Sequence, residues 1–171
     1  PIIVSTGDSK KAINNAKNTL TGSLSIGGQE HYYLEGQVAI SIPTENNEMV
    51  VHSSTQNPTE VQHLVAHVLS VPQNAIEVIT RRMGGGFGGK ETDSPQLACI
   101  CAIFSEKTNK PVKARLSRKD DILLTGKRHD FVANYEVGYS DEGLIEGINL
   151  ELAARCGYSL DLSMAIVSRA L

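Results

Sequence analysis

A glycine-rich run at residues 84–89 is the feature that most limits how this 171-residue chain can fold. Five of its six positions are glycine, and the exception is Phe87. Glycine loses more conformational entropy on folding than other residues do, and the difference from alanine is roughly 0.5–1 kcal/mol per residue. The run therefore indicates a place where backbone N–H groups approach a ligand closely with no Cβ in the way. A tight connector without a ligand is the alternative at this point.

Two phosphate-binding patterns fit this run, but its surroundings argue against both. The spacing of its glycines satisfies G-x-G-x-x-G, and residues 84–90 satisfy G-x-x-x-x-G-K. A dinucleotide-binding first strand is apolar throughout, whereas residues 75–80 alternate between apolar and polar side chains. A triphosphate loop needs Ser or Thr after its lysine to hold magnesium, and this chain has Glu91 there. We therefore expect the loop to face something other than a nucleotide.

The order of the predicted elements favours the α+β class, with mixed or antiparallel sheets and packed helices. Helices and strands follow one another in no strict alternation, and several strands alternate apolar with polar residues. We expect helices over residues 10–19, from 58 to before Pro72, and over 95–105. We expect strands over residues 29–42, 49–53, 75–80 and 112–116, and a long hairpin over 130–153.

Local signals place several side chains within these elements. Asn57 predicts a helix N-cap and Pro58 suits the first helical position, so Gln56 lies at a strand-to-helix corner, where side chains tend to point into clefts. The helix over 95–105 is apolar nearly all round and is expected to be buried. The helix after Asn57 is expected to bury Val61, Leu64, Val65 and Val68, and the hairpin is expected to bury Tyr135, Val137, Ile148, Leu150 and Leu152.

Composition excludes some partners. The net charge of −3 and the pI near 6.0 give no general attraction to nucleic acid or to acidic membranes. The longest apolar run, residues 97–104, is far too short to span a bilayer. Three cysteines without C-x-x-C spacing predict reduced, mostly buried thiols and a cytoplasmic location. His63 and His67 lie one helical turn apart without the glutamate of a zinc protease, so a solvated helix face is expected.

The two ends suggest a piece of a longer polypeptide. The chain opens on Pro1 without an initiator methionine, and residues 168–171 read as the middle of a helix. Neither end carries the polar tail that usually finishes a domain. Part of any functional site is therefore expected to lie outside this chain.

Four segments, taken in order, resemble the xanthine dehydrogenase family of molybdenum hydroxylases. Residues 27–35, GGQEHYYLE, are similar to that family's G-G-Q-E-H-F-Y-L-E signature, with Tyr32 in place of the usual Phe. Residues 54–57, STQN, match its strand end, and residues 83–92, MGGGFGGKET, resemble its molybdenum-site loop. Residues 124–129, LTGKRH, resemble its T-G-x-R-H segment. Together they are far more specific than either glycine pattern alone.

The resemblance implies a role for each matching residue. Gln56 would donate its side-chain amide to an oxygen ligand on molybdenum. The loop backbone at Gly86, Phe87 and Gly88 would also bind the cofactor, with the N–H groups at Phe87 and Gly88 pointing at the same oxo group. Phe87 would also stack on a flat substrate. Glu91 would hydrogen-bond a purine and stabilise charge developing on its ring, although a surface residue that caps the next helix is its alternative.

Two further residues were interpreted without a catalytic role. For Lys90, adjacent to the glycines, we expect that it orients Glu91 or reaches solvent, and a phosphate ligand is the less favoured reading. His31, inside the first matching segment, either is hydrogen-bonded as a structural residue or lines the site.

The same resemblance implies the wider function. Residues 1–25 would be a lead-in from a preceding domain, and residues 26–171 would be the N-terminal part of a molybdenum cofactor-binding domain. The cofactor would be molybdopterin–molybdenum, with FAD and 2Fe–2S clusters on other domains or subunits of a dimeric complex. The implied reaction is purine hydroxylation, from hypoxanthine or xanthine to urate, with the general base and most cofactor contacts outside this chain. The alternatives are another N-heterocycle or an aldehyde as substrate, or a non-catalytic structural piece.

Overall fold

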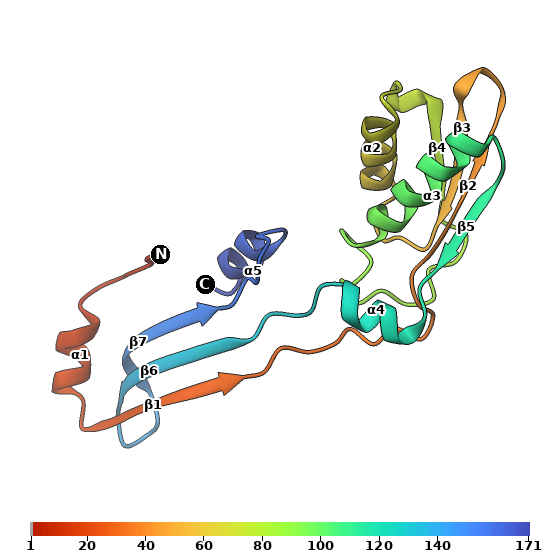
Figure 1. Ribbon diagram of the computed structural model, residues 1–171. Coiled ribbons are helices and arrows are strands. Elements are labelled where there is room, and N and C mark those ends of the chain that lie inside the picture. Colours follow the sequence, from red (N-terminus) through yellow and green to blue (C-terminus); the bar gives the residue numbers. More distant parts are fainter. Residues whose placement is uncertain (1) are drawn as a thin grey trace. The chain divides into compact units, whose positions relative to one another are not determined.

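Residues 2–171 are described by the structure, a computed structural model, and they form two compact units. One unit comprises residues up to Gln29 together with residues 128–171, and the other comprises residues 30–127 (Figure 1). Strand β1, Asn18–Ile26, belongs to the first of these units. No helix of residues 2–171 has both the length and the apolar character needed to cross a membrane.

The unit of residues 30–127 is built on a four-stranded mixed sheet, in the order β4-β3-β2-β5. The strands are β2 (Val38–Pro43), β3 (Met49–Ser53), β4 (Ile76–Ile79) and β5 (Val112–Arg115). The predicted hairpin of β2 and β3 is confirmed, whereas β4 lies parallel to β3. A polar turn, η1 (Glu45–Asn47), joins β2 to β3, and η2 (Gln73–Ala75) precedes β4. The mixed sheet confirms the predicted α+β class.

Helices α2 (Pro58–Leu69) and α3 (Ser94–Thr108) pack on one face of this sheet (Figure 1). The cap of α2 is the predicted one, because the side chain of Asn57 accepts a hydrogen bond from the Glu60 N–H. The third helix of this unit, α4 (Arg118–Leu124), begins at the Ser117 cap. The core between sheet and helices comprises Ala39, Met49, Val51, Val61, Val65, Ala66, Ile76, Ala98, Cys101 and Ala102.

One strand assignment and two burial predictions in this unit were wrong. Tyr33 is buried, but it lies in an irregular segment ahead of β2 and not in a strand. In α2, Leu64 and Val68 are exposed, because the buried stripe runs through Val61, Val65 and Ala66. In α3 only one side is buried, and Ile100 and Phe104 are exposed. The apolar composition of α3 extends around more of the helix than the sheet and α2 cover.

The other unit is a three-stranded antiparallel sheet, in the order β1-β6-β7. The predicted hairpin is confirmed as β6 (Phe131–Tyr139) and β7 (Ile145–Ala154), and α5 (Ser163–Arg169) follows. The helix predicted over residues 10–19 is shorter, because α1 spans Ser9–Asn15 and the chain then enters β1.

The predicted inner face of this hairpin is one face of the sheet, but α1 covers the opposite face. The register pairs Val137 with Ile148 and Tyr135 with Leu150, so these side chains share a side. Ile148 and Leu150 are nevertheless 48% and 47% exposed. A Cβ on Gly138 would lie 2.8 Å from the Cα of Ile13 in α1. The absence of a side chain at Gly138 therefore lets α1 approach the sheet there.

We expect the core around β4 to control the stability of the chain. Ile76 is 1% exposed, so an Ile76→Ala change should lower the free energy of unfolding by about 2–5 kcal/mol through lost burial and a cavity. The matched control is Ile3→Ala, because Ile3 is 84% exposed and should change that free energy by less than about 0.5 kcal/mol. Urea unfolding followed by circular dichroism measures both, and equal effects would contradict this core assignment.

Candidate functional site

Gln56 lies against the glycine loop and organises it. Its Oε1 atom accepts hydrogen bonds from the N–H of Gly88 at 2.9 Å and of Lys90 at 3.2 Å. Its own backbone N–H donates to the Lys90 carbonyl at 2.8 Å. Because both side-chain partners are donors, the atom facing them must be the amide oxygen. The NH2 group of Gln56 is thereby directed elsewhere, and no described residue accepts a hydrogen bond from it.

Gly86 is a loop position that has no room for a side chain. A Cβ on Gly86 would lie 2.4 Å from the Oε1 of Gln56, which is far inside van der Waals contact. Gly86 also accepts the Gly89 N–H at 2.8 Å, which closes a four-residue turn. The glycine at this position therefore allows Gln56 to reach the loop amides.

Phe87 projects from the tip of this turn. Its φ is +54° and that of Gly88 is +92°, so both central residues are left-handed, as in a type I′ turn. A bulky residue in this region is strained by about 1–3 kcal/mol, and such strain clusters at functional sites. The side chain of Phe87 is 65% exposed and presents an apolar ring at the surface of its unit. The geometry makes Phe87 available to contact a ligand.

One predicted donor has a different partner. We expected the N–H groups at Phe87 and Gly88 to point at a common ligand, but the Gly88 N–H donates to Gln56. The role of the loop amide at Gly88 is thus to fix the Gln56 side chain. Two donors near the loop remain without an acceptor among residues 2–171: the Gln56 NH2 group and the Phe87 N–H.

Glu91 follows the loop directly, as the sequence predicted. It is half-buried and follows Lys90 in the sequence. Gln56 makes two hydrogen bonds with the backbone of Lys90. Glu91 does not cap the next helix, because the N-cap of α3 is Asp93. Glu91 is therefore next in sequence to a residue whose backbone Gln56 holds, and its role toward a substrate stays a prediction.

Lys90 was interpreted wrongly. It is fully buried, with 0% of its surface exposed, and neither reaches solvent nor pairs with Glu91. Its ammonium donates to the backbone carbonyls of Glu35, at 2.7 Å, and of Met83, and it lies 4.5 Å from the centre of the Tyr33 ring. Burial lowers the pKa of this ammonium below its usual value. Lys90 thus joins the loop to the segment before β2.

A buried polar network that the sequence did not reveal lies beneath the loop. The Tyr33 hydroxyl donates to Asp121 at 2.6 Å, and the Gln37 N–H donates to the other Asp121 oxygen at 2.9 Å. The Gln37 side chain donates to the Gly89 carbonyl at 2.9 Å and accepts from Ser94 at 2.8 Å. Burial, with the Asp121 carboxylate as acceptor, raises the pKa of Tyr33 to about 12. Only the match of Tyr33 to the first family segment gave any signal of this network.

The segments that resemble the xanthine dehydrogenase family meet at this loop. The Glu35 N–H donates to the Gly84 carbonyl, and a Cβ on Gly89 would collide with the ring of His31 at 2.7 Å. Thr125 donates its hydroxyl to the Asp121 carbonyl at 2.6 Å, and the Gly126 N–H donates to Asp93. The first matching segment therefore contacts the loop directly, and the last is tied to Asp93, just after the loop.

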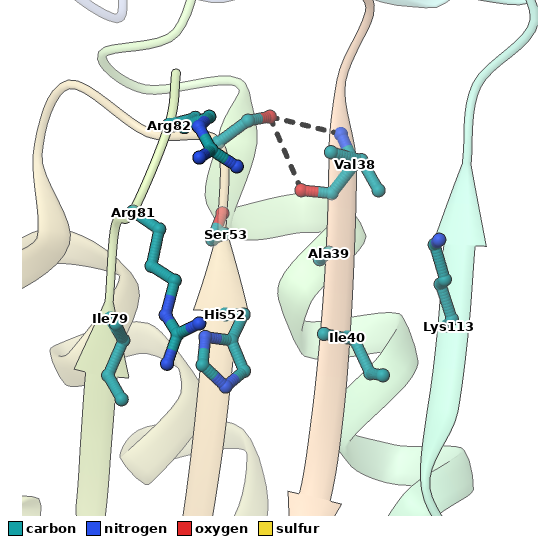
Figure 2. Close-up of a pocket in the computed structure, with 10 residues that line it drawn as sticks. Val38, Ala39, Ile40, His52, Ser53, Ile79, Arg81, Arg82 and Lys113 are labelled. Atoms are coloured by element: carbon teal, nitrogen blue, oxygen red, sulfur yellow. Dashed lines mark hydrogen bonds between the residues drawn. The ribbon is translucent and has the colours of Figure 1, made fainter.

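A separate hollow of about 380 Å³ lies on the sheet face opposite the helices. Figure 2 shows its polar lining, which includes His52, Arg81, Arg82 and Lys113 above an apolar floor of β-strand side chains such as Ile40. All the charged side chains that line it are basic, so it attracts anionic groups. None of the residues predicted for the molybdenum site lines it.

Direct metal ligation by this chain has no support among residues 2–171, where no group of three or more His, Cys, Asp or Glu side chains could hold a metal ion. His63 and His67 are exposed on α2, as predicted for a solvated helix face. The three cysteines are free, and Cys156 is exposed although we expected mostly buried thiols.

Comparison with known proteins places this site in a family. Residues 2–171 match the family described as the Molybdopterin cofactor-binding domain. The chain belongs to this family. The matched region begins well before residue 26, so α1 and β1 lie within it.

The relatives of this chain are much longer proteins. It is 44% identical over 165 residues to a xanthine dehydrogenase of Dictyostelium discoideum, covering 96% of this chain and 12% of that protein. It is 44% identical over 157 residues to a probable aldehyde oxidase of Caenorhabditis elegans, covering 92% of this chain and 12% of that protein. The chain thus spans about an eighth of the length of these relatives.

The fold is also that of a solved structure. An aldehyde oxidoreductase from Desulfovibrio gigas superposes with a TM-score of 0.79 at 22% identity, covering 89% of this chain and 16% of that one. This likeness confirms the predicted molybdopterin-domain fold.

We expect Gly86→Ala to disrupt the contact of Gln56 with the loop, because its Cβ would overlap the Gln56 oxygen. The amides of Gly88 and Lys90 should lose their acceptor and exchange with deuterium at least about tenfold faster, the loss of about one hydrogen bond. Gly27→Ala is the matched control, because a Cβ there would meet nothing within 4 Å. Unchanged exchange in Gly86→Ala, measured by mass spectrometry, would contradict the close approach described here.

We expect Tyr33 to make the alkaline stability of the chain depend on pH. Its pKa rises from 10.0 to about 12 on folding, so its neutral form is favoured in the folded state. This contribution is complete below pH 10 and is lost as the pH rises from 10 through 12. The difference in free energy of unfolding between wild type and Tyr33→Phe should therefore be constant at neutral pH and fall above pH 10. A difference that does not change between pH 8 and pH 12, measured by urea unfolding, would show that Tyr33 titrates alike in both states.

Proposed function

We propose that this chain is the N-terminal part of the molybdenum cofactor-binding domain of a molybdenum hydroxylase that oxidises purines, as xanthine dehydrogenases do. The observation that carries the proposal is the Gln56 amide, fixed by the Gly88 and Lys90 N–H groups at the edge of the glycine loop. Membership of the molybdopterin-binding family supports the cofactor. The identity of 44% to a xanthine dehydrogenase supports a molybdenum hydroxylase, and the purine is proposed from Glu91.

The residues present fit such a cofactor. A metal–oxo group accepts hydrogen bonds and needs an N–H donor that is held in place. Gln56 supplies one, because its oxygen is engaged by the loop and its NH2 group is left free to donate. Gly86 keeps the approach open, since a side chain there would displace Gln56. A bound molybdenum centre would supply the oxygen-transfer and two-electron chemistry of hydroxylation.

The role of the chain itself is to bind and orient. Gln56 donates from its amide toward the oxo ligand. Phe87, with its ring exposed at the loop tip, stacks on a flat heterocycle and excludes water from one side of it. Glu91 hydrogen-bonds the ring nitrogens of a purine and stabilises the charge that develops there in the transition state.

The rest of the assembly is proposed by resemblance. The electrons would leave through 2Fe–2S clusters and FAD on other domains or subunits of a dimeric cytoplasmic complex. The remaining cofactor contacts and the general base would come from the rest of the molybdenum domain. The length of the relatives, about eight times that of this chain, leaves room for these parts.

Aldehyde oxidation is the second candidate, because a probable aldehyde oxidase is as similar to this chain as the xanthine dehydrogenase is, at 44% identity. The carboxylate of Glu91 favours a purine over an aldehyde as substrate. The resemblance to the molybdenum hydroxylases implies an apolar residue at the matching position of enzymes that oxidise aldehydes. A carboxylate there has ring nitrogens to bind only when the substrate is an N-heterocycle.

We expect Gln56→Ala and Glu91→Ala in the full-length protein to slow xanthine hydroxylation by about 100-fold, the usual cost of losing one fixed transition-state contact. Molybdenum content should persist in Glu91→Ala, because Glu91 faces substrate. The controls are Gln73→Ala and Glu106→Ala, which make the same chemical changes at exposed positions.

A panel of xanthine, hypoxanthine, other N-heterocycles and aldehydes, assayed at equal molybdenum content, separates the candidates. Wild-type rates on xanthine in both variants would rule out the assignment. A wild-type enzyme that oxidises only aldehydes would rule out the purine and retain the cofactor site.

A further inference from the structure

Lys90, beneath the glycine loop, has no exposed surface, and the burial of its charged side chain requires a physical explanation. Transfer of an ammonium from water into a protein interior is costly unless the charge is hydrogen-bonded and compensated. Lys90 is 0% exposed and belongs to no ion pair among residues 2–171. Its compensation therefore comes from elsewhere.

Three groups satisfy the Lys90 ammonium. Two are backbone carbonyls, of Glu35 at 2.7 Å and of Met83, and the third is the face of the Tyr33 ring, 4.5 Å away. These are as many partners as an ammonium has protons. Glu35 precedes β2 and Met83 opens the glycine loop, so a single side chain fastens these two segments to each other.

The negative charges of two carboxylates favour the Lys90 ammonium: Asp121, which is 1% exposed, and Glu35. The Tyr33 hydroxyl donates to Asp121 at 2.6 Å, while the face of the same ring receives Lys90. A phenol bonded to a carboxylate has a more electron-rich ring, and this strengthens its attraction for a cation. Tyr33 thus contacts both the buried Lys90 ammonium and the buried Asp121 carboxylate, which form no ion pair with each other.

The backbone of Lys90 reaches the candidate site from the other side. Its N–H donates to the Gln56 Oε1 at 3.2 Å, and its carbonyl accepts from the Gln56 N–H at 2.8 Å. The Thr55 hydroxyl donates to the same carbonyl at 3.2 Å. Lys90 therefore binds the first residue before the glycine run, Met83, through its side chain and binds Gln56 through its main chain.

We propose that Lys90 is a positioning residue, whose buried ammonium, together with Tyr33 and Asp121, fixes the glycine loop and thereby aims the Gln56 amide and the Phe87 ring at the cofactor and substrate. The inference rests on the proposed function for its catalytic consequence. Its structural part, the fastening of the loop, does not depend on that function.

The test uses the full-length protein with Lys90→Met, which keeps the length of the side chain and removes its charge and donors. Amides 88–90 should exchange at least about tenfold faster, while α2 stays as protected as in wild type, because the loss is local. At equal molybdenum content, kcat should fall by at least about tenfold with KM changed less than about threefold, because misplaced groups cost mainly transition-state stabilisation. Lys119→Met is the matched control, since Lys119 is exposed.

Two results would overturn the proposal. Wild-type exchange at amides 88–90 in Lys90→Met would mean that the ammonium does not fasten the loop. Faster exchange throughout α2 and the loop together would mean that Lys90 supports the whole unit and has no positioning role. If the wild-type protein hydroxylates none of the substrates, the proposed function fails, and the exchange measurement still decides the role of Lys90 in the loop.

Tyr33→Phe is the second variant if Lys90→Met does not fold. It keeps the ring face beside Lys90 and removes the hydroxyl that donates to Asp121. The same local pattern is expected with smaller amplitude, about threefold in exchange of amides 88–90. Exchange and kcat equal to wild type would overturn the coupling through Tyr33.

Discussion

Two backbone N–H groups of the glycine loop share one acceptor, the Oε1 atom of Gln56, and the candidate site depends on this interaction. It turns a flexible amide into a fixed donor, because the engaged oxygen determines where the NH2 group points. It also explains the glycine at position 86, where any Cβ would overlap the acceptor. The entropy that the loop glycines lose on folding is offset by this close approach.

Beneath the loop, polar groups replace the apolar packing that a core normally has. Lys90, Tyr33, Gln37 and Asp121 are all buried, and each is hydrogen-bonded. Such networks contribute little net stability, because desolvation offsets much of the attraction. They specify one arrangement instead, since a small shift would leave a buried charge without its partners. This is the property that a loop needs if it must place a donor accurately.

The local sequence signals were reliable where a few neighbouring residues decide the structure. The cap at Asn57, the corner at Gln56 and the β6–β7 hairpin were all predicted, because capping chemistry and alternation act over a few residues. Burial was predicted less well. Ile100 is apolar and exposed, and Lys90 is charged and buried, because burial depends on which segments pack against a residue.

The sequence by itself determined the α+β class, the glycine loop and the residues around it that resemble the molybdenum hydroxylases. Only the tertiary structure decided how those residues are used. In the folded chain the Gly88 N–H donates to Gln56, and the Lys90 ammonium contacts two carbonyls and the Tyr33 ring. The physical reason is that hydrogen-bond partners 32 and 55 residues apart in sequence leave no periodic pattern along the chain. Their pairing exists only once the strands and helices have packed.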